Sequence, residues 1–280
     1  MDKVPPRKPS FLWRATGTRE LRRQPLFTGL SWFVLLLLYA PIAVLIVFSF
    51  NDNRSVVVWT EASLRWYETA LGNENVRNAA WISIQVALTA TGVSTIIATM
   101  AALATTRGGD FRGKSAAIAL INQPLMIPEI VTAIATLSFF SILRKLTGVS
   151  GIGWLMLAHT VFCIPFAFMP IRARLSDMSD TFELAAADLY ATPWQAFRHV
   201  TLPLLMPGIL SGAMLAFVVS LDDVIITLLI AGPGETTLPL YILGQIRRGV
   251  TPEVNAVSTI LILLTVAMVA LTFALQRKRK

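Results

Sequence analysis

The run Phe27–Phe50, FTGLSWFVLLLLYAPIAVLIVFSF, holds 24 consecutive residues without a charged side chain. A helix needs about 20 apolar residues to cross the hydrocarbon core of a bilayer, so this run predicts a membrane-spanning helix. A secretory signal has a shorter apolar core followed by a small-residue cleavage site, and no such site follows this run. We therefore expect the run to be the first span of the protein.

Five further apolar runs predict that the chain crosses the membrane six times. They cover residues 80–104, 127–143, 151–171, 206–230 and 254–275. Pro124 and Pro128 interrupt the third apolar region, and proline breaks the interior of a helix. We therefore place the third span after this break and a separate helix near the inner surface at residues 115–126. The predicted fold is an all-α membrane protein with six transmembrane helices.

The composition agrees with a membrane protein. Of 280 residues, 55% are hydrophobic and 14% are charged, whereas a soluble domain carries about a quarter charged residues. The net charge is +8, which is typical of basic loops retained in the cytoplasm. No basic stripe alternates with aromatics, so we expect no nucleic-acid partner. The single cysteine, Cys163, lies in an apolar run without metal-ligating neighbours, so we interpret it as a small buried hydrophobe and expect no metal site.

The basic residues are divided unequally between the two sets of loops. One set, residues 1–26, 105–114, 172–203 and 276–280, holds 7, 3, 3 and 4 of them; the other set, residues 51–79, 144–150 and 231–253, holds 3, 2 and 2. Basic loops stay in the cytoplasm, so the first set should be inside. We therefore expect both termini in the cytoplasm. The predicted parts are a cytoplasmic N-terminal tail (1–26), a transmembrane domain (27–275) and a basic C-terminal tail (276–280).

The predicted cytoplasmic loop at residues 172–203 carries two signals for helix starts. Asp180 and Glu183 have the spacing of a capping box and should begin a short alanine-rich helix. Thr192 and Gln195 have the same spacing and should begin a second helix. Two short helices would form a compact knob whose narrow alanine face suits close contact with another protein. The caps alone fit an ordinary hairpin between two spans equally well.

This loop resembles the coupling loop of ABC importer permeases, whose motif is E-A-A-x-x-x-G-x9-I-x-L-P. Ala185-Ala186 matches its beginning, and residues 200–203, VTLP, match its end. Leu184 stands at the motif glutamate, directly after Glu183. Tyr190 stands at the motif glycine, where a left-handed turn would cost a non-glycine residue about 1–2 kcal/mol. The resemblance implies docking on a cytoplasmic ATPase through Glu183, Leu184, Ala185, Ala186, Ala187, Tyr190, Leu202 and Pro203.

The resemblance extends from about Leu35 to Ala274 and is strongest toward the spermidine/putrescine permeases. The similar segments are Tyr39-Ala40-Pro41, Ser49-Phe50-Asn51, Trp66-Tyr67, Met126-Ile127-Pro128-Glu129, Ser220-Leu221-Asp222-Asp223, Ala231-Gly232-Pro233-Gly234, Leu238-Pro239-Leu240 and Pro252-Glu253-Val254-Asn255-Ala256. Branches for opines, amino-acid derivatives and ferric iron share parts of these segments. A permease for an opine or an amino-acid derivative is therefore the alternative to a polyamine permease.

The resemblance implies the second permease subunit of a bacterial polyamine importer, a multi-pass protein held by lipid in the inner membrane. It also implies three protein partners. A sister permease would complete a heterodimer around the translocation path, a cytoplasmic ABC ATPase dimer would drive it, and a periplasmic substrate-binding protein would deliver the substrate. We expect no cofactor in this chain, because the sequence lacks a Walker phosphate loop and ATP would bind the ATPase subunit.

Three acidic residues fall within or beside predicted spans. Glu129 begins the third span, and Asp222 and Asp223 lie in the fifth. An aspartate at the centre of a spanning helix costs about 2.5–3.5 kcal/mol, so these carboxylates should face protein or a wet path. At 1.5 Å per residue, Asp222 would lie roughly 24 Å above the start of its span, and Glu129 would lie deeper, in the inner half. Such a pair of sites suits a cationic substrate, although each carboxylate could instead cap a helix.

Three further side chains have both a functional and a structural interpretation. His159 in the fourth span could relay protons, but a lone membrane histidine more commonly bonds to a neighbouring helix. Trp66 and Tyr67 follow the first span on the predicted outer side. Aromatics at that level commonly lie among lipid headgroups, and in a polyamine carrier they could hold an ammonium by cation–π attraction.

Other classes of function fit the sequence less well. No HExxH or GxSxG motif is present, and the chain has two histidines, so an intramembrane enzyme is disfavoured. An ion-coupled secondary transporter could use Asp222, Asp223, Glu129 and His159 as a relay. Such carriers usually have inverted repeats, and nothing in their mechanism requires an alanine-rich cytoplasmic knob. We therefore predict a transport subunit without catalytic residues.

Overall fold

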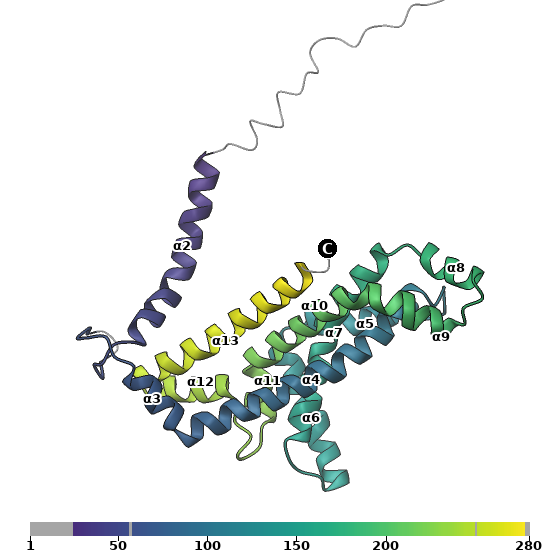
Figure 1. Cartoon of the computed structure of the whole chain (residues 1–280). Coiled ribbons are helices and arrows are strands. Elements are labelled where there is room, and N and C mark those ends of the chain that lie inside the picture. The colour runs from purple at the N-terminus through teal and green to yellow at the C-terminus, as the bar shows by residue number, and fades with distance from the viewer. Residues whose placement is uncertain (1–24, 56–57, 250, 278–280) are drawn as a thin grey trace, which may run out of the picture. The chain divides into compact units, whose positions relative to one another are not determined.

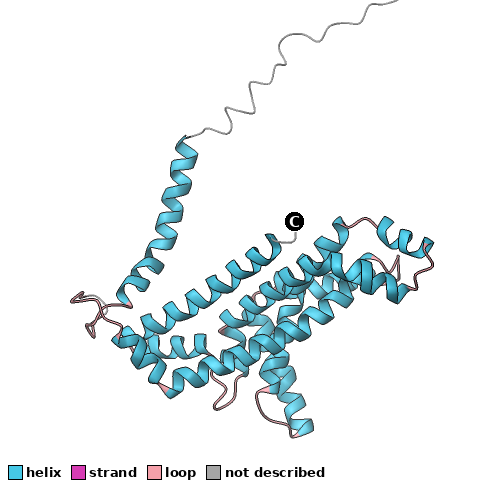
Figure 2. Ribbon diagram, in the orientation of Figure 1, coloured by secondary structure: helices cyan, strands magenta, loops and turns pink. Residues whose placement is uncertain are grey.

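The computed structural model describes residues 25–55, 58–249 and 251–277. Residues 1–24 of the predicted tail (1–26) and the basic residues 278–280 lie outside these ranges. The described residues form helices and loops, without a β-strand beyond one isolated bridge between Asn51 and Ala62 (Figure 2). The prediction of an all-α protein is confirmed.

The helices are α2 (Pro25–Phe48), α3 (Arg65–Gly72), α4 (Glu74–Thr106), α5 (Lys114–Met126), α6 (Glu129–Thr147), α7 (Gly153–Asp177), α8 (Thr181–Asp188), α9 (Pro193–Ala196), the π-helical η2 (Phe197–Thr201), α10 (Leu202–Asp222), α11 (Ile225–Ile230), α12 (Leu238–Arg248) and α13 (Pro252–Arg277) (Figure 1). Among the described residues, six segments are long and apolar enough to cross a membrane, as predicted. They are Phe27–Phe48, Glu74–Thr106, Glu129–Thr147, Gly153–Asp177, Pro193–Asp222 and Pro252–Ala270.

The chain divides into two compact units, residues 1–48 and residues 49–280. The described part of the first unit is the single uncharged helix α2. The second unit contains all the other helices and every site discussed below.

The core of the second unit is formed by α4, α7 and α10, which pack against one another. Small side chains let these helices approach closely, as in other membrane bundles. A β-carbon added at Gly212 of α10 would lie 2.5 Å from the carbonyl oxygen of Ala167 in α7. Cys163 is fully buried in this core, and its Sγ donates to the carbonyl oxygen of Ala216 at 3.4 Å. The interpretation of Cys163 as a small buried residue is confirmed.

The third apolar region breaks where the prolines predict. Ile127 has an extended backbone with φ −98° and ψ 139°, because the ring of the following Pro128 disfavours a helical conformation for the residue before it. The break separates α5 from α6. Two other spans are longer than predicted: α4 begins at Glu74, and α7 continues to Asp177.

The prediction of one continuous span over residues 206–230 is wrong. The helix α10 ends at Asp222, and the chain turns at Asp223 before the short helix α11. The side chain of Asp223 accepts hydrogen bonds from the backbone N–H groups of Ile226 and Thr227. Aspartate side chains compete with the helical backbone in this way, which explains why one helix ends here and another begins.

The second unit has two distinct ends (Figure 1). The helices α8 and α9 lie at one end, and α3 and α12 lie at the opposite end. The long helix α4 begins beside α3 and runs toward α8 and α9. We refer to the segment Ser179–Thr201 as the knob and to the two ends as the knob end and the α12 end.

Candidate functional sites: an acidic pocket and a helical knob

A pocket of about 400 Å³ lies where α6 begins and α10 ends. All three predicted membrane carboxylates line it, and we call it the acidic pocket. Its lining residues are Glu129, Phe162, Phe166, Val218, Val219, Asp222, Asp223, Val224 and Ile225. This lining contains no lysine, arginine or histidine.

The expectation that Glu129 lies at a different depth from Asp222 and Asp223 is wrong, since all three line one pocket. The error comes from residues 115–126, which were predicted to form a helix near the inner membrane surface. In the structure α5 packs against α7. Its 13 residues rise about 20 Å at 1.5 Å per residue, which carries Glu129 well away from the knob end.

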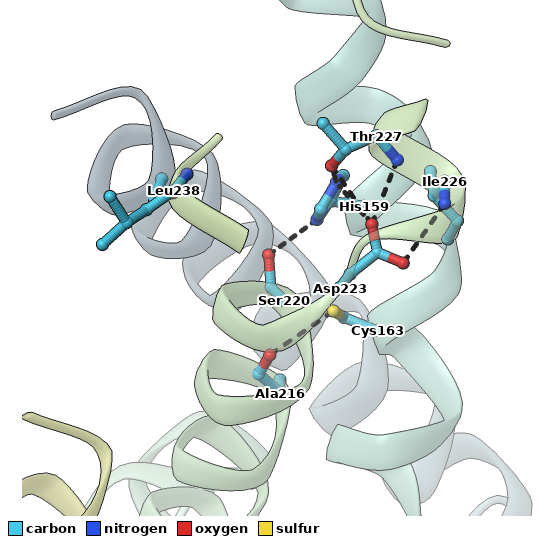
Figure 3. Close-up of polar contacts among 9 residues, drawn as sticks. His159, Cys163, Ala216, Ser220, Asp223, Ile226, Thr227 and Leu238 are labelled. Atoms are coloured by element: carbon cyan, nitrogen blue, oxygen red, sulfur yellow. Dashed lines mark hydrogen bonds and ion pairs between the residues drawn. The ribbon is translucent and has the colours of Figure 1, made fainter. Parts of the chain in front are cut away.

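Asp223 is the buried member of the aspartate pair (Figure 3). Its Oδ1 accepts from the N–H of Ile226 at 3.3 Å, and its Oδ2 accepts from the N–H and the hydroxyl of Thr227, both at 3.1 Å. His159 Nε2 lies 3.4 Å from the same Oδ2. Asp223 therefore caps α11, which is the structural alternative that the sequence left open.

His159 joins three parts of the chain next to Asp223 (Figure 3). The side chain is fully buried, with Nδ1 2.9 Å from the Ser220 hydroxyl and Nε2 3.1 Å from the Thr227 hydroxyl. The ring thus links α7 to the end of α10 and to α11. The prediction that this histidine bonds to a neighbouring helix is confirmed.

The open side of the acidic pocket carries the other two carboxylates. Asp222 is exposed and Glu129 is half-buried, whereas the carboxylate of Asp223 is turned into the protein. Asp222 is the last residue of α10, whereas Asp223 has an extended backbone after the helix ends, which accounts for the different surroundings of the two aspartates. Glu129 and Asp222 are therefore the carboxylates that a molecule entering the pocket can reach.

The acidic pocket also has an aromatic wall that the sequence analysis missed. Phe162 and Phe166 lie one turn apart on α7, with ring centroids 5.4 Å apart. Their i, i+4 spacing in the fourth apolar run was the available signal, but nothing in the sequence indicated that this face meets the carboxylates. Aromatic faces attract cations, so carboxylates and rings together suit an ammonium group.

The structure does not bring Trp66 and Tyr67 into the acidic pocket. Trp66 is buried in α3, and the Arg65 guanidinium lies 5.2 Å from the centre of its ring. The Tyr67 hydroxyl lies 2.6 Å from the hydroxyl of Ser49, and its ring packs on Phe50 at 5.2 Å. Both aromatic residues thus lie in α3 at the α12 end of the second unit, away from the acidic pocket.

One of the two predicted caps of the knob is confirmed. The Thr192 hydroxyl accepts from the Gln195 N–H at 3.4 Å, and the Gln195 side chain accepts from the Thr192 N–H at 2.8 Å. The predicted capping box at Asp180 is wrong, because the Asp180 side chain makes no cap bond. The carboxylate of Glu183 is bound elsewhere, by Thr201 and Arg107.

Tyr190 occupies the left-handed turn that the motif glycine would serve. Its φ is +61°, and its side chain is 96% exposed. The N–H of Tyr190 donates to the carbonyl of Ala187, and the N–H of Ala191 donates to the carbonyl of Ala186. This pair of bonds forms a Schellman motif at the end of α8. The turn therefore has the geometry that the motif requires, with a tyrosine in place of glycine.

The remaining motif residues lie on or beside the surface of the knob. Large apolar side chains on this surface are exposed, namely Phe182, Leu184, Leu189, Tyr190 and Trp194. Ala185 and Ala187 are exposed and Ala186 is half-buried, while Leu202 and Pro203 begin α10. Several exposed large apolar side chains on one short segment are typical of an interaction site.

Comparison with known sequences gives a consistent result. Residues 94–278 match the family described as binding-protein-dependent transport system inner membrane component. The putrescine transport system permease protein PotI of Escherichia coli is 38% identical over 80% of this chain and 81% of its own length. The spermidine/putrescine transport system permease protein PotC of Haemophilus influenzae is 38% identical over 86% of this chain and 92% of its own length. A putative 2-aminoethylphosphonate transport system permease, PhnV of Salmonella typhimurium, is 30% identical over 86% of this chain and 87% of its own length.

Comparison with solved structures identifies the same fold. A chain of a bacterial ABC transporter that imports the acidic polysaccharide alginate has a TM-score of 0.65 at 15% identity, covering 94% of this chain and 98% of that chain. A chain of the MetNI methionine ABC transporter in an inward-facing conformation has a TM-score of 0.60 at 20% identity, covering 72% of this chain and 94% of that chain. At these identities the likeness is one of fold.

Proposed function

The chain belongs to the family of binding-protein-dependent transport system inner membrane components, and from this premise we propose that it carries polyamines such as putrescine and spermidine. It is a multi-pass inner-membrane permease of an ABC importer. The proposed cargo is the class of substrate, putrescine and spermidine, that appears in the names of two relatives at 38% identity.

The observation that carries the proposal is the charge of the acidic pocket. Three carboxylates line it without a basic residue in the lining. A carboxylate within a membrane protein is costly and needs a partner or a task. Asp223 has internal partners, but Glu129 and Asp222 face the open pocket. Two ammonium groups of one polyamine would supply the missing positive charge, and Phe162 and Phe166 would contact its alkyl chain or its ammonium groups.

2-Aminoethylphosphonate is a second candidate cargo, because one relative is named for its transport. That molecule carries an amine and an anionic phosphonate. The amine would suit the carboxylates, but the phosphonate would need a cation, and the lining of the acidic pocket holds none. The pocket therefore favours a substrate whose charges are all positive. An opine or amino-acid derivative, which carries a carboxylate, is disfavoured for the same reason.

The knob is the proposed docking site of the ATPase. In this arrangement the knob end faces the cytoplasm and both termini lie there, as the distribution of basic residues predicts. An ATPase dimer binds the exposed apolar surface of the knob, and ATP binds that subunit. A sister permease covers the open side of the acidic pocket to complete a heterodimeric path. A periplasmic binding protein delivers the substrate at the α12 end, and a complex with a periplasmic protein is known for the alginate transporter.

The test of the cargo is uptake by the complete complex in proteoliposomes supplied with its binding protein. The double variant Glu129→Gln, Asp222→Asn keeps size and most hydrogen bonding but removes both open charges. We expect radiolabelled putrescine or spermidine uptake to fall at least about tenfold, which corresponds to about 1.4 kcal/mol at 25 °C. The matched control is Asp110→Asn, an exposed carboxylate in the loop between α4 and α5, which should leave uptake unchanged. Parental uptake by the double variant would show that the pocket does not bind the cargo.

A further inference from the structure

Glu183 lies where three helical segments meet. Its Oε1 accepts from the Thr201 hydroxyl at 2.9 Å, and Arg107 Nε lies 3.3 Å from Oε2 and 3.4 Å from Oε1. Glu183 belongs to α8, Arg107 is the C-cap of α4, and Thr201 ends η2 directly before α10. One carboxylate therefore ties α8 to the end of α4 and to Thr201, the N-cap of α10.

Arg107 is itself fixed at the end of α4. Its Nη2 donates to the carbonyl of Met178 at 2.8 Å, and its backbone N–H donates to the carbonyl of Leu103 at 2.8 Å. The side chains of Arg107 and Glu183 are only 21% and 26% exposed. A partly buried, charge-assisted contact of this kind is stronger than an ion pair at the surface.

The contact with Thr201 reaches α10. Thr201 is 4% exposed and forms the last residue of a π-helical turn. Such turns are uncommon and are frequent at functional sites, because the helix is locally rewound there. The Glu183 carboxylate thus binds the π-helical turn that leads directly into α10.

The helix α4 has fixed contacts at its other end too. The N-cap Asn73 donates from Nδ2 to Glu253 Oε1 of α13 at 2.8 Å. The Ser83 hydroxyl accepts from the N–H of Leu238, the first residue of α12, at 2.7 Å. The 33 residues of α4 rise about 50 Å, so one helix connects the knob with the α12 end.

We propose that Glu183 and Arg107 form the joint through which the knob moves α4 and α10, and hence the α12 end. Glu183 is then a positioning residue of the transport cycle that faces its own chain, whereas the sequence motif grouped it with the residues that dock on the ATPase. Leu184, at the motif position of the docking glutamate, is exposed instead. This inference rests on the proposed role of the knob as the ATPase site.

The test compares Glu183→Gln, Arg107→Gln and the double variant in the reconstituted complex with its ATPase and binding protein. Glutamine at 183 still accepts from Thr201 but loses the charged contact with Arg107. We expect each single variant to lower uptake per ATP hydrolysed by about tenfold, within the range of roughly 5- to 150-fold typical of coupled sites. The double variant should lose no more than either single one, because both remove the same contact. The proposal would be overturned if the fold-losses in uptake per ATP of the two single variants multiplied in the double variant. It would also be overturned if Glu183→Gln coupled ATP hydrolysis to uptake as well as the parent does.

The matched control is the ion pair of the exposed Asp110, in the loop after α4, with Lys114, the first residue of α5, at 3.1 Å. Asp110→Asn should leave coupling unchanged. If Glu183→Gln does not assemble, Thr201→Val removes only the hydroxyl, and it should lower coupling at least about tenfold, as expected for one hydrogen bond to a charged group. Parental coupling in Thr201→Val would then count against the joint.

A second measurement does not depend on the cargo. Spin labels at Asp188→Cys on α8 and Ala104→Cys on α4 report the distance between the knob and α4 in the complex with a non-hydrolysable ATP analogue. We expect one narrow distance distribution in the parent and a broad one in Glu183→Gln. Equal widths would refute the joint. A parent complex that shows the narrow distribution but takes up no polyamine would refute only the polyamine assignment.

Discussion

His159 and Asp223 lie against each other in the interior of the second unit, with Nε2 3.4 Å from Oδ2 and both side chains shielded from solvent. The histidine comes from the first third of α7, and the aspartate comes from the break between α10 and α11. This contact fixes the floor of the acidic pocket. His159 and Asp223 therefore shape the pocket from inside the protein, whereas Glu129 and Asp222 are the carboxylates that a substrate can reach.

Replacing His159 by alanine should destabilise the permease. The substitution leaves the buried hydroxyl of Ser220 without its partner, at a cost of about 1–3 kcal/mol, and it removes one of several contacts of the Asp223 carboxylate. Thermal unfolding of the purified complex measures the loss. The matched control is His199→Ala on the exposed surface of the knob, where the change should stay within about 0.5 kcal/mol. Equal melting temperatures for the two variants would contradict the structural role of His159.

The two neighbouring aspartates should respond differently to the same substitution. Asp223 uses both carboxylate oxygens as acceptors, and asparagine has only one, so Asp223→Asn should lose about 1–3 kcal/mol of stability. Asp222 is exposed at the pocket, so Asp222→Asn should leave stability within about 0.5 kcal/mol while polyamine uptake falls. Unfolding and uptake are measured on both variants. Loss of stability in Asp222→Asn, or its absence in Asp223→Asn, would contradict this division of roles.

Glycine at position 190 should stabilise the turn of the knob relative to alanine. Tyr190 has φ +61°, and a residue with a β-carbon pays about 1–2 kcal/mol for this conformation. Glycine also makes the unfolded chain more flexible, which offsets about 0.4–1 kcal/mol. We therefore expect Tyr190→Gly to exceed Tyr190→Ala in stability by up to about 1 kcal/mol. Amide exchange of Ala191, whose N–H closes the turn, measures the difference, and equal exchange in both variants would refute the predicted strain.

Local signals in the sequence predicted local structure well. Pro128 marked the break before α6, and Thr192 with Gln195 marked the start of α9, because both effects act within a few residues. The partners of Glu183 could not be found in this way. Arg107 lies 76 residues away in the chain, and only the tertiary fold brings it, at the end of α4, to Glu183. The same holds for Glu129, which meets Asp222 because α5 packs on α7.

The proposed orientation predicts opposite sides for two positions in the last third of the chain. Reporter fusions after Gln245 in α12 and after Lys280 should report outside and inside, respectively, since α13 would cross the membrane between them. The reason is the excess of lysine and arginine in the loops assigned to the cytoplasm. A fusion after Gly109, between α4 and α5, serves as the control and should report inside. The same side for Gln245 and Lys280 would refute the six-span orientation.

The docking role of the knob predicts a specific defect for Ala186. This residue is half-buried on α8 between the exposed Ala185 and Ala187, so a large charged side chain there would hold a docked ATPase away from the helix. Ala186→Arg should let the complex assemble and hydrolyse ATP, but uptake per ATP should fall at least about tenfold, within the range of a typical coupling free energy.

Ala186→Ser is the matched control, because serine adds one atom and no charge, and it should transport at the parental rate. Assembly is followed by size-exclusion chromatography, and hydrolysis and uptake are measured on the same proteoliposomes. Because the carbonyl of Ala186 closes the turn at Tyr190 through its backbone alone, the arginine variant should keep the fold of the knob. Normal coupling in Ala186→Arg would show that the ATPase does not contact this face of α8.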